Sequence, residues 1–281
     1  MGFQINNNVA AFNAYRNLST TQNSVSSSLE KLSSGLRINR AADDAAGLAI
    51  SEGLRSQVGG LKVAVRNAQD GISVVQTAEG ALGTSTSILQ RMRDLTVQSA
   101  NTGGLNDAAK GNIQKEVDQL AEELTRISTT TKFNGKALLD GTYNGAFQVG
   151  ANGGEQIAVR ITAAADPATS TALGAAGLGV GALDVKTDAG STAALTAIDT
   201  AIGTVSTVRA DLGAKQNRLE MTIKNLNVSV ENLSASESRI RDTDMAAEMV
   251  SFTKSQILSQ AGTAMLAQAN QMGQGVLSLL R

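Results

Sequence analysis

The sequence predicts a mainly α-helical fold, in which the N- and C-terminal halves form an elongated antiparallel helical bundle or coiled coil with a small β-hairpin region in the middle. Apolar residues recur in steps of three and four in both halves, whereas a short central stretch alternates with period two. Only 2% of the 281 residues are aromatic although 42% are hydrophobic. Aliphatic side chains must therefore bury most of the apolar area, which is typical of thin helix-to-helix contacts.

The first predicted helix covers residues 1–36. Its apolar residues follow Leu18 in steps of seven, four, three and four, which is the spacing of an amphipathic helix with a coiled-coil contact face. Gly35 interrupts this pattern, and the residues that follow are expected to form a connector. Asp43 or Asp44 then supplies the side-chain oxygen that caps the next helix.

Two further helices are expected in the N-terminal half. The second extends to about Ala100 and would be roughly 85 Å long at 1.5 Å per residue, so we expect a rod. Residues 101–104 form a turn, and Asn106 or Asp107 caps a third helix that the short link places antiparallel to the second. Glycines inside the second helix each weaken it by about 1 kcal/mol relative to alanine, and close approach of a neighbouring helix is the expected compensation.

The middle of the chain changes period. Alternating apolar residues flank Asn152-Gly153, which predicts a β-hairpin with its turn. The residues that carry this pattern are Phe147, Val149, Ile157, Val159 and Ile161. Residues 163–190 are rich in Ala, Gly and Thr and show no sustained period, so we expect an exposed, variable connector.

Heptad spacing returns in the C-terminal half. Apolar residues from Ile198 to Ile240 lie on one ladder of three- and four-residue steps, which predicts a long helix alongside the second one. The last segment, from about Asp244, is apolar and nearly free of charge, but its many amide side chains favour a helix buried in protein over a membrane span. We expect the two ends of the chain to pair, with residues 36–43 beside residues 238–244.

These elements predict three parts. They are an inner terminal-helix domain of residues 1–40 plus 243–281, a rod domain of residues 41–140 plus 191–242, and a β-hairpin with an exposed variable loop over residues 141–190. The terminal helices carry narrow apolar stripes that a single chain cannot cover, so we expect a homopolymer whose ends order on assembly. The residues assigned to polymerisation are Ile5, Val9, Phe12, Leu18, Leu258, Leu266, Leu277 and Leu280.

Composition argues against several functional classes. The chain has no histidine and no cysteine, so the commonest general base, metal ligand and thiol nucleophile are missing, and we expect no enzyme and no cofactor. Its 24 basic and 25 acidic residues give a net charge of −1, which argues against nucleic acid as a partner. Asp43 and Asp44 could hold a cation, but helix capping is the simpler explanation. The N-terminus lacks the pattern of a cleavable signal peptide.

Motifs in both halves are more specific than composition. The N-terminal half contains LSSGLRIN at residues 32–39, DDAAG at 43–47 and LQRMRDL at 89–95. The C-terminal half contains SRIRDTD at residues 238–244 and QAGTAMLAQANQ at 260–271. Over nearly its full length the chain resembles bacterial flagellin, in a short form with a minimal central variable region.

The resemblance implies a structural subunit that self-assembles into the helical propeller used for motility. It implies an extracellular location on the flagellum and export of the unfolded chain through the flagellar type III apparatus. The implied partners are a dedicated export chaperone, the filament cap and the hook–filament junction proteins, with no membrane insertion. The alternative function is an adhesin or host-interaction stalk protein built on the same rod, for which the central region is short.

The resemblance also implies a surface for an innate immune Toll-like receptor. Arg91, Leu95 and Glu116 match the family residues that this receptor recognises, and the sequence places them on two antiparallel helices. Asp94 departs from the family, because many members have glutamate there.

Overall fold

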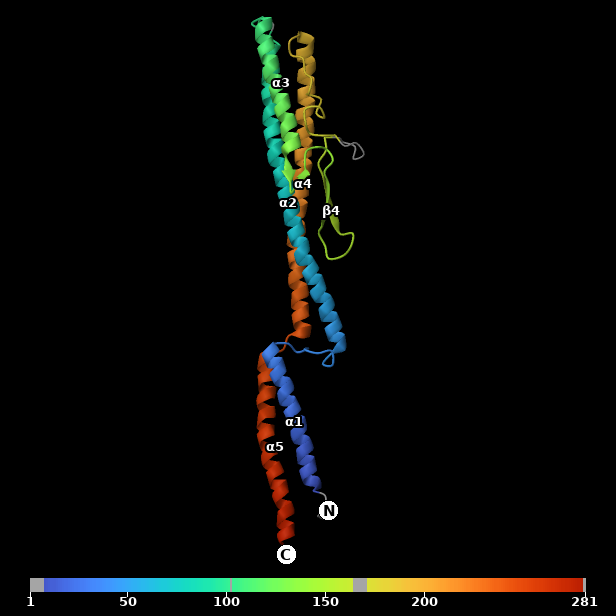
Figure 1. Cartoon of the computed structure of the whole chain (residues 1–281), viewed down its shortest axis with the longest axis vertical. Helices are drawn as coiled ribbons and strands as arrows, with labels where there is room; N and C mark the ends of the chain where they lie inside the picture. Colours follow the sequence, from blue (N-terminus) through green and yellow to red (C-terminus); the bar gives the residue numbers. More distant parts are fainter. Residues whose placement is uncertain (1–7, 102, 164–170, 280–281) are drawn as a thin grey trace. The chain divides into compact units, whose positions relative to one another are not determined.

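The computed structural model describes residues 8–101, 103–163 and 171–279, with side chains described as far as Gln271. Within these residues the chain forms five α-helices and two small antiparallel sheets (Figure 1), which confirms the predicted fold class. The helices are α1 (Val9–Ser34), α2 (Ala45–Ser99), α3 (Asp107–Thr130), α4 (Asp188–Arg241) and α5 (Met245–Leu279). The strands are β1 (Lys132–Phe133), β2 (Lys136–Ala137), β3 (Asn144–Gln148) and β4 (Gln156–Arg160).

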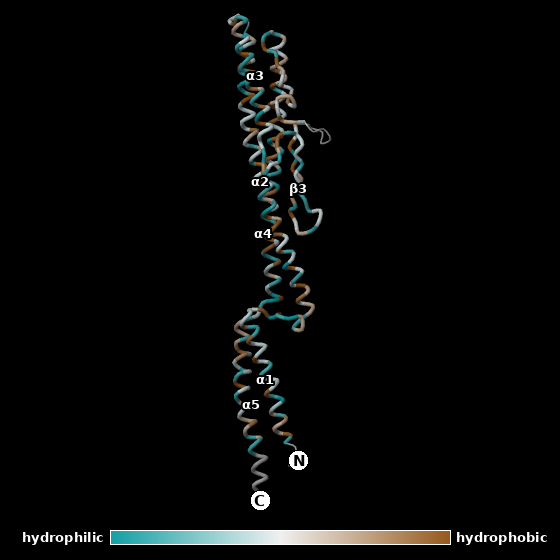
Figure 2. Tube along the Cα trace, in the orientation of Figure 1, coloured by the Kyte–Doolittle hydropathy of each residue, from teal (hydrophilic) through white to brown (hydrophobic). Residues whose placement is uncertain are grey.

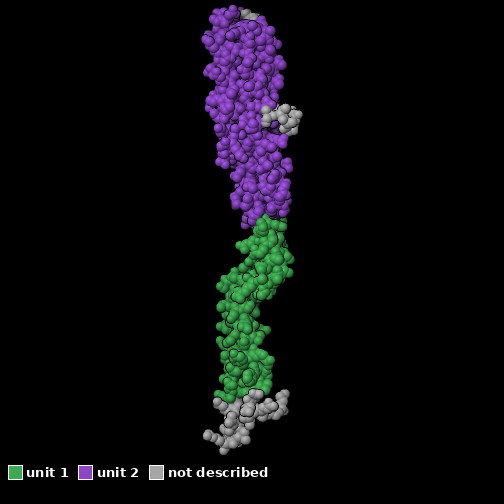
Figure 3. Space-filling model, turned by 45° about the vertical axis from the view of Figure 1, so that its right-hand side comes forward, with its two compact units in different colours: residues 1–57, 231–281 green, residues 58–230 purple. Residues whose placement is uncertain are grey.

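The chain divides into two compact units. Unit 1 consists of residues 1–57 and 231–281, and unit 2 consists of residues 58–230 (Figure 3). Helices α2 and α4 contribute residues to both units. The three-part division expected from the sequence stays a prediction.

Unit 2 has one large aliphatic core. The buried residues of α2, α3 and α4 face one another at the expected three- and four-residue spacing, because these positions lie on one side of each helix. Among them are Leu82, Leu89, Met92, Val117, Leu124, Ile198, Val205 and Leu212. As predicted, α3 is capped at its N-terminus by Asn106, whose Oδ1 accepts a hydrogen bond from the Ala109 amide at 2.8 Å.

Two hairpins lie between α3 and α4 in the sequence. The predicted hairpin is confirmed as β3–β4, with Phe147 opposite Ile157, and the buried residues of β4 alternate with exposed ones. A shorter hairpin, β1–β2, was not predicted. Its two-residue turn is Asn134-Gly135 with φ of 45° and 77°, and asparagine followed by glycine is the preferred pair where both turn residues need positive φ.

The segment before α4 corrects one prediction. The described residues 171–187 are not an exposed connector, because their apolar side chains belong to the core of unit 2. These are Leu173, Ala175, Leu178, Val180 and Val185, each less than 9% exposed. Irregular backbone can be buried here because side chains of α2, α3 and α4 satisfy its polar groups.

Gln114 of α3 makes the central contacts to this segment. Its Oε1 accepts a hydrogen bond from the Val185 amide at 2.8 Å, and its Nε2 donates to the Leu183 carbonyl at 2.7 Å. Ser99 and Ser191 both donate to the Val185 carbonyl. The Gln114 amide thus both accepts from and donates to the backbone of this segment, as a neighbouring β-strand would.

The glycines of α2 differ in their surroundings. A Cβ atom on Gly71 would lie 3.3 Å from the Leu219 side chain of α4 and 3.3 Å from the Phe147 ring of β3, so this glycine allows close packing. Gly59, Gly80 and Gly83 have open space around the same position. Close approach therefore explains Gly71 but not these three glycines.

Candidate functional site: the outward surface of the terminal helices

Helices α1 and α5 pack along each other in unit 1 (Figure 1), as predicted for the two ends of the chain. One set of partly or fully buried positions in both helices follows a three-four spacing, which defines a coiled-coil seam. These seam positions are Ala11, Ala14, Leu18, Thr21, Val25, Ser28 and Leu32 in α1, and Glu248, Phe252, Ser255, Ser259, Gly262, Leu266 and Ala269 in α5. Glu30 and Lys31 of α1 are also partly buried but lie outside this set. Most of the seam side chains are small or polar, so the seam buries little apolar area.

Contacts along the seam show that the helices are antiparallel. Asn8, which caps α1 through the Ala11 amide, also donates from Nδ2 to the Ala269 carbonyl at 2.9 Å. Leu18 packs over Gly262, where an added Cβ would lie only 3.1 Å from Leu18 Cδ1. A small residue at position 262 therefore lets the two helices approach closely.

Several large apolar side chains of the same helix pair are exposed. Hydrophobic residues recur along α5 (Figure 2). The exposed fractions of the large side chains range from 47% at Met245 to 71% at Val250. The exposed residues are Val9, Phe12, Tyr15 and Leu29 in α1, and Met245, Met249, Val250, Ile257, Leu258 and Met265 in α5. We call this set the outward apolar surface. Its side chains are larger and more apolar than most of those in the seam.

The residues that the sequence assigned to polymerisation separate into three groups. Val9, Phe12 and Leu258 belong to the outward apolar surface. Leu18 and Leu266 lie in the seam, so the assigned residues of α1 do not form a single stripe. Ile5 and Leu280 lie outside the described residues, as does the side chain of Leu277.

Sequence reasoning missed several members of the outward apolar surface. Tyr15, Val250, Ile257 and Met265 were not singled out, because the stripe was traced through the large apolar residues alone. Tracing the seam through alanine, serine and glycine would have left these large residues among the exposed positions.

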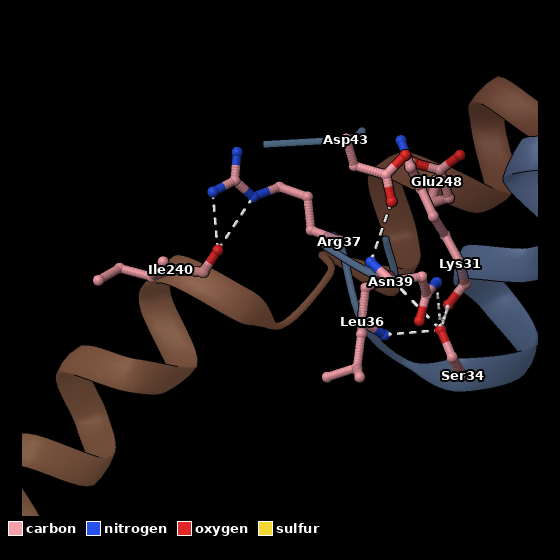
Figure 4. Close-up of polar contacts among 8 residues, drawn as sticks. All are labelled: Lys31, Ser34, Leu36, Arg37, Asn39, Asp43, Ile240 and Glu248. Carbon is pink, nitrogen blue, oxygen red and sulfur yellow. Dashed lines mark hydrogen bonds and ion pairs between the residues drawn. The ribbon is translucent and has the colours of Figure 1, made fainter. Parts of the chain in front are cut away.

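The connectors of unit 1 pair as predicted (Figure 4). Leu36 and Asp242 form an antiparallel bridge, and the Arg37 amide donates to the Arg241 carbonyl at 2.7 Å. The Arg37 guanidinium adds hydrogen bonds of 2.7 and 3.3 Å to the Ile240 carbonyl, which satisfy the C-terminal end of α4. Residues 36–37 are thereby fixed to the junction between α4 and α5.

The two aspartates after this bridge have separate structural roles. The Asp43 carboxylate accepts hydrogen bonds from the Arg40 amide at 2.9 Å and the Asn39 amide at 3.0 Å, and these bonds lower the pKa of Asp43 below its usual range. Asp44 caps α2 by accepting from the Gly47 amide at 2.8 Å. Helix capping, the simpler explanation for this pair, is therefore confirmed for Asp44. In the described part of the chain, no cluster of three or more acidic residues could hold a metal ion.

Gly47 has a steric reason to be glycine. A Cβ at this position would lie 2.4 Å from Asp44 Oδ2 and 2.8 Å from Ile38 Cδ1, and Ile38 is only 1% exposed. The motif at residues 43–47 thus combines a turn, a helix cap and a close contact with the connector.

The residues assigned to receptor recognition do not share one surface. Arg91 and Glu116 are exposed and form an ion pair, in which Arg91 Nη2 and Nε donate to Glu116 Oε1 at 2.6 and 2.9 Å. Leu95 is only 2% exposed and belongs to the core of unit 2. The expectation that the Leu95 side chain lies on the surface is wrong, because α2 presents it to α3 and α4.

Comparisons with known proteins identify the family. Residues 5–144 match the family model for the bacterial flagellin N-terminal helical region, and residues 195–280 match that for the bacterial flagellin C-terminal helical region. The chain belongs to the bacterial flagellin family. It is therefore a structural subunit of the flagellar filament, which lies outside the cell, and the adhesin alternative is not favoured.

Individual family members match the chain over nearly its whole length. Flagellin of Bacillus subtilis strain 168 is 52% identical over 307 aligned residues, covering 99% of this chain and 100% of the relative. Flagellin of Halalkalibacterium halodurans is 53% identical, covering 99% of each chain. The crystal structure of Bacillus cereus flagellin is 32% identical and has a TM-score of 0.49, covering 57% of this chain and 88% of that one. No helix among the described residues is long and apolar enough to span a membrane.

Proposed function

We propose that the outward apolar surface of α1 and α5 forms the contacts between neighbouring copies in the filament. The observation that carries this proposal is the distribution of side chains between the seam and the exposed positions of the helix pair. The seam holds mainly small and polar residues, whereas Phe12, Val250 and Ile257 are at least 60% exposed. Covering one such side chain fully contributes about 1.5–3 kcal/mol. A few contacts with each neighbour then suffice to favour assembly.

The same distribution supports a coupling between folding and assembly. Ordering the backbone costs roughly 1–2 kcal/mol per residue, and a seam of small side chains offsets little of that cost. Neighbouring copies supply the missing apolar contacts. In the free chain we accordingly expect about forty residues at each end to lack stable helical structure.

Paired serine substitutions on the outward apolar surface test the proposed contacts. Val250→Ser with Ile257→Ser should raise the critical concentration for filament assembly at least tenfold, while the thermal transition of unit 2 stays unchanged. Gln256→Ser is the matched control, because Gln256 is also exposed on α5 but is polar. Normal assembly of the double variant would contradict the proposed contacts.

Export and capping partners are the second part of the proposal. The chain leaves the cell through the flagellar type III apparatus, binds an export chaperone through its C-terminal helix, and meets the hook–filament junction proteins and the cap during growth. Family membership and the exposed apolar residues of α5 support this. No catalysis and no cofactor are involved. Pull-down of the chain with its export chaperone, with and without residues 245–281, tests the assigned chaperone site.

Toll-like receptor recognition is a third, separate proposal and rests on the exposed pair Arg91 and Glu116. In a receptor reporter assay with unassembled protein, Arg91→Ala and Glu116→Ala should each lower the response. Arg93→Ala is the matched control, because Arg93 is exposed on the same helix and pairs with Asp199 at 2.7 Å. A full response from both test variants would remove the proposal.

A further inference from the structure

The methionines of the described chain divide sharply by exposure. Met92 is fully buried in the core of unit 2, at 0% exposed. In contrast, Met221, Met245, Met249 and Met265 are 70%, 47%, 50% and 64% exposed. The sequence has no cysteine, so methionine is its sole sulfur-containing side chain. Exposed thioethers are the groups of this chain most open to two-electron oxidation.

Three of these methionines belong to the outward apolar surface. Met245 and Met249 are one helical turn apart on α5, so their side chains are neighbours. Met265 follows Leu258 by seven residues and therefore lies on nearly the same side of the helix.

Met221 gives an independent site in unit 2. It lines an open groove of about 760 Å³ between α2, α4 and the end of the β3–β4 hairpin. Leu61, Val149 and Leu226 line the same groove and make it largely apolar. An exposed methionine in such a groove is suited to contact another apolar surface.

We propose that Met245, Met249 and Met265 are sites of reversible oxidation that control assembly, with Met221 as an additional site. A peroxide is the oxidant. The thioether sulfur attacks one peroxide oxygen, a sulfur–oxygen bond forms as the oxygen–oxygen bond breaks, and the other oxygen leaves as water after taking up a proton. The sulfur loses two electrons, which the peroxide gains.

Oxidation changes the surface in a way that opposes assembly. A sulfoxide is polar and accepts hydrogen bonds, so covering it with an apolar neighbour leaves the oxygen without a partner. Each covered sulfoxide should raise the critical concentration about tenfold. Methionines already covered by neighbouring copies are shielded from the oxidant. This inference rests on the proposed role of the outward apolar surface.

Peptide mass mapping after hydrogen peroxide treatment tests the chemistry on the full-length protein. In the unassembled chain, Met221, Met245, Met249 and Met265 should each gain one oxygen while Met92 stays unmodified. In preformed filaments, oxidation of the three α5 methionines should be at least tenfold slower. Equal rates in the two states would overturn the shielding and with it the proposal.

Assembly of the treated protein tests the consequence. Peroxide should raise the critical concentration. Treatment with methionine sulfoxide reductases and a dithiol, which supplies two electrons per sulfoxide and becomes a disulfide as water leaves, should restore it. A variant with Met245→Leu, Met249→Leu and Met265→Leu should assemble normally and lose most of the peroxide effect, because leucine has similar volume and no sulfur. Unchanged assembly of oxidised wild-type protein, or failure of the reductases to restore it, would overturn the proposal. Assembly of untreated protein, and hence the proposed function, would be unaffected by either outcome.

Discussion

Replacement of Gln114 tests whether residues 183–188 are an integral part of unit 2. Gln114 is 8% exposed, and its amide forms hydrogen bonds with both the Val185 N–H and the Leu183 carbonyl. Gln114→Leu keeps a side chain of similar size but removes the amide oxygen and nitrogen that form these two hydrogen bonds. The Val185 amide then remains buried without a hydrogen bond, since Val185 is 0% exposed.

The expected loss of stability follows from these two groups. Leaving a buried donor unsatisfied costs about 1–3 kcal/mol, and this cost applies in full to the Val185 amide. The Leu183 carbonyl is only partly buried, so water can replace its lost hydrogen bond at a smaller cost. We therefore expect the free energy of unfolding to fall by about 1–3 kcal/mol. Such a loss is a large fraction of the stability of an ordinary domain.

Urea unfolding followed by circular dichroism measures this change. Gln119→Leu is the matched control, because Gln119 is exposed on the same helix and its side chain donates to Glu122 Oε2 at 3.2 Å. The control should change the free energy of unfolding by less than about 0.5 kcal/mol. Hydrogen exchange at the Val185 amide should accelerate in Gln114→Leu. Equal stability of the two variants, with slow exchange at Val185 in both, would refute the docking of this segment.

Three further predictions concern unit 1 and its assembly. Gly47→Ala should destabilise the connector by about 1–4 kcal/mol, because the added Cβ overpacks the site and displaces the Asp44 cap. Gly53→Ala has open space around it and should stabilise α2 by up to about 1 kcal/mol. Hydrogen exchange in filaments should therefore be faster near the connector in the first variant and slower in α2 in the second. Asp43 contributes stability above pH of about 4 that is lost as pH falls through its lowered pKa, so acid should loosen the connector in wild-type filaments, and Asp43→Asn should remove this pH dependence. Removal of residues 1–36 and 245–281 should abolish polymerisation but preserve the thermal transition of unit 2; normal filaments from the trimmed chain would contradict this.

The long helices and the connector pairing were predictable because their signals are local and periodic. The three-four ladder from Ile198 onward places one side of α4 in the core, and Asn106 marks the start of α3. The approach of residues 36–37 to residues 240–243 followed from the symmetry of the sequence about its middle. Among these features, only the pairing of the two ends depends on contacts between residues that are distant in the sequence.

The docked segment before α4 could not be predicted in the same way. Leu173, Val180 and Val185 are buried, but the backbone between them is irregular, so their spacing has no period to detect. Its polar groups are satisfied by Gln114 and Ser99, which lie 69 to 86 residues away in the sequence. The Ala-, Gly- and Thr-rich composition therefore predicts an exposed segment. In the structure the segment is buried, because distant side chains form hydrogen bonds with its backbone.

The terminal helices show why the size of an apolar residue is a poor guide to the side on which it packs. Leu18 is buried because Gly262 opposes it, whereas Phe12 is 67% exposed although it is larger. In a single chain this arrangement leaves apolar area uncovered, since several large side chains contact water while small and polar side chains occupy about half of the seam. In a homopolymer it is favourable, because a narrow seam brings two helices together and leaves the strongest apolar contacts for neighbouring copies. If the outward apolar surface forms the contacts proposed above, selection for assembly, rather than for the stability of the isolated chain, accounts for this distribution.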